Sequence, residues 1–418
     1  MKMLFKLAFR NVFRYKRRTI ITFSAISYGL GLMAVGISLY NGVNARAMDN
    51  IINYQTAHLK ILASGYFEKK DEVPLEFTID EPQEIKSLLK DNQDIQGIES
   101  RILFQASIIT GMDELPCLGV AIEPEVDPLV FKIKESIKDG RFLEPSESKI
   151  ILGSGLARDL GLEVGDDCVL RLFLSTEDFI WNALDLEIIG IAKTENPMVN
   201  RQTVFIPLSL AQEALSLENR VTELAVRIKD RNQLLEVKDS IQSRLATLNE
   251  EYEVVSFEEY ASDFKELMRL RSRIQVLIPL MMILIATLGI VNTMLMAVME
   301  RTREIGMLAA MGMRKLEIML VFVFEGALIG VFGSLTACVI GGLGGWWLET
   351  KGFSMSFLGK EMSDILSFFP IEVFKGDLTV GILIFTLVLG IVVSILASLY
   401  PAYKAVKLDP IQALRHVG

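Results

Sequence analysis

The chain contains 418 residues, of which 51% are hydrophobic and 23% are charged, and its formal net charge is −9. Its only two histidines, His58 and His416, leave neither a catalytic triad nor a zinc site a plausible set of side chains. The sequence has no G-x-x-x-x-G-K-[ST] segment, so the chain does not cradle nucleotide phosphates in the P-loop manner.

Residues 1–18 form a basic segment that contains no acid. Short flanks rich in Lys and Arg stay on the cytoplasmic side of a membrane, so we expect the N-terminus inside. Cations recur every four residues opposite an apolar side, which predicts an amphipathic helix in the headgroup layer. These cations are Lys2, Lys6, Arg10 and Arg14. The alternative is a simple cluster of topogenic charges.

Four apolar stretches are long enough to cross a bilayer core of roughly 30 Å. We place the spans at residues 19–43, 271–299, 317–348 and 378–402. A cleaved signal peptide is the alternative for the first span, because Ala45-Arg46-Ala47 has the spacing that a signal peptidase accepts. The apolar stretch there is longer than a signal-peptide core and favours a retained span.

Residues 44–270 carry 42 acidic and 24 basic side chains, in contrast to the basic ends of the chain. With the N-terminus inside, this segment and the short loop 349–377 lie outside, and the tail 403–418 returns to the cytoplasm. The sequence therefore predicts an α-helical membrane protein with four transmembrane helices and a large mixed α/β extracytoplasmic domain between the first and second.

The external segment alternates between β-rich runs and helical patterns. We expect strands at 58–62, 102–110, 168–174, 186–191, 203–207 and 223–228. We expect helices at 154–160, ended by Gly161, at 208–217 and at 232–248, and a helix from 250 to 273 that continues into the second span. Cys117 and Cys168 lie in this segment, and whether they pair stays open.

The link at 300–316 has the sequence Glu300-Arg-Thr-Arg-Glu-Ile-Gly-Met-Leu-Ala-Ala-Met-Gly-Met-Arg314. A charged entry is followed by an apolar ridge of Ile305, Met307, Leu308 and Met311, and Gly312 is placed as a helix C-cap. The pattern predicts a short helix across the cytoplasmic face, whose apolar side chains contact either a partner groove or lipid.

Small residues four apart allow close helix approach in lipid, so the third span is expected to be a packing helix. The pairs are Gly326-x-x-x-Gly330 and Gly341-x-x-x-Gly345. Glu325 is an acid inside this span, and it is either an interface-placed carboxylate or a residue with a coupling role.

Three cytoplasmic motifs resemble the FtsX-like permease family, which has a MacB-like fold. The link resembles E-R-T-x-E-I-G-x-L-x-A-x-G, the opening L-A-F-R-N-V-F-R resembles the basic entry helix of the family, and the tail from Pro401 resembles P-A-x-x-A-x-x-x-D-P-x-x-A-L-R. The external run at 150–166 is also similar, so the resemblance covers nearly the whole chain. The A-H-L-K-I strand at 57–61 is similar to the G-H-L-x-I of lipoprotein-releasing permeases of the LolC/LolE type.

The resemblance implies a type VII ABC complex in the bacterial inner membrane, with both termini in the cytoplasm. Two permeases, identical or different, would pair, and each would touch a separate ABC ATPase subunit that binds ATP and Mg²⁺, while this chain binds no cofactor and is no enzyme. The implied contact residues are Glu300, Arg301, Glu304, Ile305, Gly306, Leu308 and Gly312.

The resemblance favours release of lipoproteins from the inner membrane to a periplasmic carrier. Two alternatives remain at this point. One is an exporter of a peptide, macrolide or other amphiphile that works with a periplasmic adaptor. The other is a regulator of cell-wall hydrolases, whose external domain is usually smaller.

Overall fold

The computed structural model describes residues 2–14, 16–111, 113–175, 180–248, 252–262, 277–354 and 373–407. The chain divides into two compact units. The helical unit comprises Met1–Asn44, Leu267–Phe353 and Phe374–Gly418, and the α/β unit comprises Ala45–Glu266 and Ser354–Val373. These bounds separate the apolar stretches from the acidic segment between the first two.

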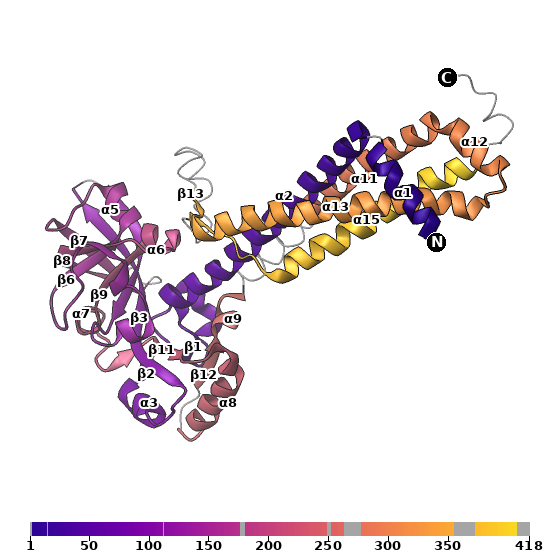
Figure 1. Ribbon diagram of the computed structural model, residues 1–418. Helices are drawn as coiled ribbons and strands as arrows, with labels where there is room; N and C mark the ends of the chain where they lie inside the picture. Colours follow the sequence, from indigo (N-terminus) through magenta and orange to yellow (C-terminus); the bar gives the residue numbers. More distant parts are fainter. Residues whose placement is uncertain are drawn as a thin grey trace. The chain divides into compact units, whose positions relative to one another are not determined.

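The helical unit contains four long helices that are apolar enough to cross a membrane, and Figure 1 labels them α2, α11, α13 and α15. They span Lys16–Ile51, Leu277–Glu300, Lys315–Thr350 and Val380–Val406. Two shorter helices, α1 (Lys2–Arg14) and α12 (Thr302–Ala310), flank them. The four predicted spans are therefore confirmed as long apolar helices, although α2 extends eight residues beyond its expected end. Residues 271–276 of the second predicted span lie outside the described part of the chain.

Apolar side chains from all four long helices and from α1 form the core of the helical unit. Ile26, Leu30 and Met33 of α2 pack against Ile290 and Met294 of α11 and against side chains of α13. The outward faces of these helices stay apolar, as expected for helices that contact lipid.

The α/β unit is organised around the long strand β3 (Ile95–Thr110). Its first half pairs with β11 (Glu223–Ile228), and its second half pairs with β4 (Asp113–Ile122) and β7 (Asp167–Ser175). The path of paired strands runs β12-β1-β11-β3-β4-β9-β6-β8-β5 through the described residues. One strand therefore joins the two halves of the sheet, and one buried cluster contains side chains from both halves, among them Ile61 of β1 and Leu170 of β7.

The other strands of this sheet are β1 (Leu59–Ala63), β5 (Ile137–Gly140), β6 (Lys149–Gly153), β8 (Ile180–Ala192), β9 (Thr203–Pro207) and β12 (Tyr252–Ser256). Two-residue strands form separate pairs, β2 (Ile79–Asp80) with β10 (Arg220–Val221) and β13 (Phe353–Ser354) with β14 (Val373–Phe374). The covering α-helices are α3 (Pro82–Leu89), α4 (Asp127–Val130), α5 (Ser154–Leu160), α6 (Pro197–Gln202), α7 (Leu208–Ala214), α8 (Leu234–Leu245) and α9 (Phe257–Tyr260). Short π- and 3₁₀-helical segments lie at Ile52–Thr56, Phe67–Glu72, Lys134–Ser136 and Arg231–Gln233.

Most of the elements expected in the external segment are confirmed. All six predicted strands exist, although β3 and β8 begin seven and six residues earlier than expected. Helix α5 ends at Gly161, which has the left-handed φ of +68° that a glycine C-cap provides. Asp230 caps the first turn that leads into α8, because its side chain accepts a hydrogen bond from Asn232 N.

The prediction of a continuous helix from 250 to 273 is wrong at its start. Residues Tyr252–Ser256 form β12, which pairs antiparallel with β1. The side chain of Ser256 then accepts a hydrogen bond from Glu259 N at 3.3 Å, and the Glu259 carboxylate accepts one from Ser256 N at 2.8 Å. This capping box begins α9, so the helix cannot start before it. Residues 263–276 lie outside the described part of the chain.

Candidate functional site

The short helix α12 begins at a sharp corner directly after α11. Arg301 stands between the two helices with φ −105° and ψ 16°, outside the helical range. Thr302 donates a hydrogen bond to the carbonyl oxygen of Met299 at 2.8 Å and thereby ties the first residue of α12 to the end of α11. The corner turns the chain out of the span.

The end of α12 is a Schellman motif. Gly312 N donates to Ala309 O at 3.1 Å, Met313 N donates to Leu308 O at 3.1 Å, and Gly312 has a φ of +92°. These two bonds satisfy carbonyl groups that the helix end would otherwise leave open. The predicted C-cap is confirmed. Directly afterwards, the Glu317 carboxylate accepts from Arg314 N at 2.8 Å as α13 begins.

The two faces of α12 differ in burial. Ile305 is buried in a cluster with side chains of α11, α13 and α15, among them Val298, Phe322 and Ala402. Met307 and Met311 are 45% and 76% exposed, and they point away from that cluster. The expectation that Ile305 belongs to an exposed ridge is therefore wrong, because its position on the helix turns it toward the other spans.

A buried ion pair lies at the corner of α12. Arg301 Nη1 is 3.3 Å from Glu325 Oε2 of α13, and the side chains are 3% and 0% exposed. Glu325 is therefore an interface-placed carboxylate, as one of the two expectations had it. A coupling role for it stays a prediction. No local pattern indicates this pairing, because the two residues are 24 positions apart in the chain.

A second pair joins α12 to the entry helix. Arg14 Nη1 of α1 lies 3.3 Å from Glu304 Oε1, and both side chains are substantially exposed. Helix α1 also packs against the bundle through Ala8 and Val12, which are buried. The link and the basic entry helix therefore lie at the same end of the helical unit, where Figure 1 labels α1 and α12.

The apolar residues of α1 fall into a buried group and an exposed group. Its small residues Ala8 and Val12 face the protein, whereas Phe5, Phe9 and Phe13 remain 43–54% exposed beside the cations. The ring of Phe5 lies 6.2 Å from that of Phe324 in α13. The predicted amphipathic helix thus packs on α13 and leaves a phenylalanine stripe for lipid. The side chains of Lys6, Arg10 and Arg14 are exposed, and that of Lys2 lies outside the described atoms.

The glycines of α13 mark close helix contacts. A Cβ added at Gly326 or Gly330 would lie 2.6 Å from the Cβ of Ser398 or Ser394 of α15. A Cβ at Gly341 would lie 2.7 Å from that of Ala34 in α2. At Gly345 it would meet the side chain of Leu378 at 2.9 Å. All four glycines chosen from the sequence therefore lie against a neighbouring element.

The seven residues expected to touch an ATPase occupy two environments. Buried in the helical unit are Arg301, Ile305 and Gly306. Exposed or half-buried are Glu300, Glu304, Leu308 and Gly312. The exposed set, together with Met307 and Met311, is the surface that a partner can reach, while the buried set holds this surface in place. The contact itself stays a prediction.

The α/β unit holds buried charges that the sequence did not reveal as partners. Arg101 of β3 binds Glu99 at 3.0 Å and Asp127 of α4 at 2.7 Å, and all three side chains are at most 2% exposed. Burial raises the pKa of Glu99 and of Asp127, and the Arg101 guanidinium opposes that rise. The group lies where β3 passes from β11 to β4, so it joins the two halves of the unit.

Burial shifts the pKa values of three further titratable groups in the α/β unit. Lys60 Nζ lies 2.5 Å from Glu223 Oε2 and 4.0 Å from the ring centroid of Tyr260, and burial lowers its pKa. Burial and the nearby guanidinium of Arg227 lower the pKa of His58 to about 4. Burial raises the pKa of Cys117 to about 12, and both it and Cys168 are free thiols in the structure. These groups belong to the core of the unit.

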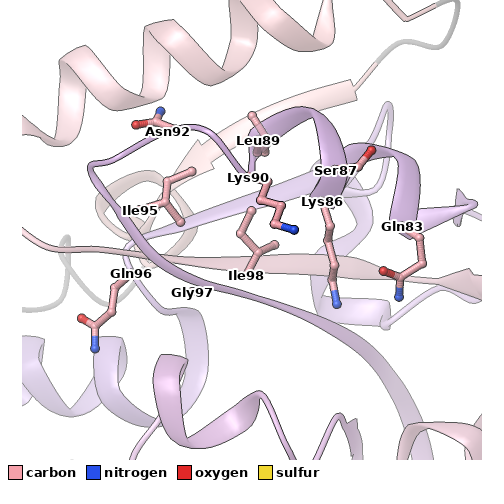
Figure 2. Close-up of a pocket in the computed structure, with 10 residues that line it drawn as sticks. All are labelled: Gln83, Lys86, Ser87, Leu89, Lys90, Asn92, Ile95, Gln96, Gly97 and Ile98. Atoms are coloured by element: carbon pink, nitrogen blue, oxygen red, sulfur yellow. The ribbon is translucent and has the colours of Figure 1, made fainter.

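A surface pocket of about 430 Å³ lies between α3 and the start of β3, and Figure 2 shows its lining. Leu89, Ile95 and Ile98 supply apolar surface, and Lys86 and Lys90 supply cations. The amine of Lys86 is held 2.5 Å from the Glu123 carboxylate, so it is already used by the fold. Among the described residues, no set of three or more His, Cys, Asp or Glu side chains is arranged to hold a metal ion.

Comparisons with known proteins match the chain along nearly its whole length. The family model described as MacB-like periplasmic core domain matches residues 19–244, and the FtsX-like permease C-terminal model matches residues 276–410. The lipoprotein-releasing system transmembrane protein LolC of Neisseria meningitidis is 24% identical over 95% of this chain and 94% of that protein. LolE of Haemophilus influenzae, also named as a lipoprotein-releasing system transmembrane protein, is 25% identical over 94% of each chain.

A partial relative is the macrolide export ATP-binding/permease protein MacB of Bdellovibrio bacteriovorus. It is 26% identical over 66% of this chain and 41% of that protein. The resemblance found in the cytoplasmic motifs therefore extends to the external segment as well.

Proposed function

Because this chain belongs to the FtsX-like ABC permease family with a MacB-like periplasmic core domain, we propose that it transmits the motions of a separate ATPase subunit across the bacterial inner membrane. It is an ABC transporter permease of the LolC/LolE and MacB type. In this proposal both termini and α12 lie in the cytoplasm, and the α/β unit lies in the periplasm.

The observation that carries the proposal is the construction of α12. A nine-residue helix is fixed at one end by a buried corner and closed at the other by a glycine cap, and it presents Met307 and Met311 outward. Flexible methionine side chains suit a contact surface that must adapt to a partner. The sequence contains no P-loop, and in this proposal a separate ATPase subunit supplies the nucleotide energy. Helix α12 is the contact for that chain.

The cargo we propose is a lipoprotein, passed from the inner membrane to a periplasmic carrier. Support comes from the two relatives whose names state lipoprotein release, since each matches over nearly the full length of both chains. Moving acyl chains out of a bilayer costs about 0.8 kcal/mol per CH₂. Mechanical work on an external domain can provide the free energy for this step, and the transfer requires no pore. A second permease completes the complex.

The second candidate is export of a peptide, macrolide or other amphiphile with a periplasmic adaptor. The match to a macrolide exporter, which covers 66% of this chain, favours it. The two candidates share the ATPase contact and differ in what the α/β unit engages.

A reconstitution tests the proposal and separates these candidates. The chain, its co-purified ATPase and any second permease are placed in proteoliposomes that contain a triacylated lipoprotein, and the lipoprotein in the soluble fraction is measured with and without ATP. We expect ATP-dependent release that is lost in Met311→Asp and kept in Met198→Asp, a matched change at an exposed methionine of α6.

Two results would count against the proposal. Co-purification of an adaptor and an outer-membrane channel without lipoprotein release would favour export. A chain that purifies without any ATPase would contradict the coupling role itself.

A further inference from the structure

The corner between α11 and α12 is attached to α13 by the buried pair of Arg301 and Glu325. Glu325 is ten residues beyond the first residue of α13, which places it about 15 Å along that helix at 1.5 Å per residue. The corner is therefore tied to a point well inside the apolar span, not to the adjoining turn.

The surroundings of the pair are apolar and close-packed. Val298, Ile318 and Phe322 form one cluster with Ala402 and Ala405 of α15. On the other side, Gly326 brings the backbone of α13 against Ser398. Charges in such a place lose much of their hydration, and apolar side chains of similar size often give equal or greater stability. The need for stability alone does not account for an ion pair here.

An ion pair differs from apolar packing in the displacements that it resists. Apolar side chains attract without direction, so packed helices can slide past one another by small steps at little cost. A guanidinium and a carboxylate in a low-dielectric site hold a fixed distance and direction. The other ion pair of α12, Arg14 with Glu304, is exposed, and exposed pairs contribute little.

We propose that Arg301 and Glu325 are positioning residues that carry displacement of α12 to α13. The proposal rests on the proposed function, in which an ATPase moves α12. When that partner moves the exposed face of α12, the corner moves with it, and the ion pair makes α13 follow. Without the pair, α12 would move over the apolar cluster, and only the start of α13, which residues 311–314 join to α12, would be displaced with it.

The test follows α13 directly and needs no cargo. The full complex with its ATPase is placed in nanodiscs, with Cys117, Cys168 and Cys338 replaced and nitroxide labels at two exposed positions. The labelled positions are Leu343 of α13 and Leu32 of α2. The distance between the labels is measured by pulsed electron paramagnetic resonance without nucleotide and with ATP and vanadate.

We expect the nucleotide-driven change in the distance between the two labels, present in the parent chain, to be lost in Glu325→Gln and in Arg301→Gln. Co-purification measures ATPase binding in each variant, and the distance change is compared in the complexes that keep the ATPase. The exchange R301E/E325R restores opposite charges and should recover most of the change. Glu76→Gln is the matched control, because it removes a carboxylate from an exposed pair with Lys69.

If Glu325→Gln folds poorly, Glu325→Asp replaces it in the distance measurement. This variant keeps the charge and draws the carboxylate back by one methylene. Variants that lose yield or thermal stability yet show the full distance change in their folded fraction would overturn the inference and leave a structural role. A wild-type complex that binds an ATPase but shows no nucleotide response would overturn both the inference and the proposed function.

Discussion

Replacing Gly326 by alanine tests the contact between α13 and α15 with the smallest possible change. The added Cβ would lie 2.6 Å from the Cβ of Ser398 and 3.2 Å from the carbonyl oxygen of Ser394. Carbon atoms in contact normally stay about 3.5–4.0 Å apart. The two helices must therefore separate by about 1 Å at this point, or Ser398 must leave its place.

The expected effect combines two terms of opposite sign. Alanine favours a helix over glycine by about 0.8–1.0 kcal/mol. Overpacking a close contact costs about 1–3 kcal/mol, and it outweighs the helix term where neither neighbour can yield. Gly342 lies on the same helix with no atom within 4 Å of an added Cβ, so Gly342→Ala should show the helix term alone. We expect the two variants to differ by about 2 kcal/mol in the free energy of unfolding.

Equilibrium unfolding in mixed micelles, with rising sodium dodecyl sulfate and intrinsic fluorescence as the signal, measures this difference. Gly326→Ala should unfold at lower detergent fraction than the parent chain, and Gly342→Ala at equal or higher fraction. Equal shifts for the two variants would refute the reasoning, since the close approach of α13 to α15 would then have no energetic consequence.

Further predictions concern the α/β unit and the link. His58 has a pKa of about 4 in the folded chain and 6.5 in the unfolded chain, so only the unfolded state takes up a proton between these values. The contribution of His58 to the free energy of unfolding should fall by about 1–2 kcal/mol from pH 7 to pH 5, measured in urea as the difference between the parent chain and His58→Gln. Arg101→Met leaves two buried carboxylates without their cation and should cost about 3–5 kcal/mol in the same assay, whereas the exposed Arg158→Met should cost under about 1 kcal/mol. Residues 44–270 expressed alone should be soluble and melt cooperatively by circular dichroism, and an aggregated product would contradict the domain boundaries. Gly306→Trp places an indole on the buried side of α12 and should abolish transport while membrane insertion, measured by fractionation, stays normal.

Local signals in the sequence predicted the long helices of this protein and their glycine contacts and caps. Span length and hydropathy predicted the four long helices, and the φ of Gly312 follows from the glycine that a Schellman cap requires. The spacing of glycines in α13 predicted a packing helix, because missing side chains leave room for another backbone.

Features that depend on a distant partner were not predictable in this way. The segment 250–273 was expected to form one helix that continues into the second span. Its residues 252–256 instead form β12, because they pair with β1. The partners Arg301 and Glu325 are 24 residues apart, and they meet only because the chain turns at a corner whose angle no local pattern encodes. Ile305 also faces inward because of the corner between α11 and α12, which turns this side of α12 toward the other spans.

The central claim is that the exposed face of α12 contacts an ATPase subunit. A photoreactive amino acid at position 311, in place of Met311, tests it in native membranes. We expect a cross-link to one ABC ATPase, with a yield that changes when ATP and vanadate are added. We expect no such product from position 198 on α6. Cross-links from position 311 to lipid alone would show that the exposed face of α12 contacts the membrane and not an ATPase.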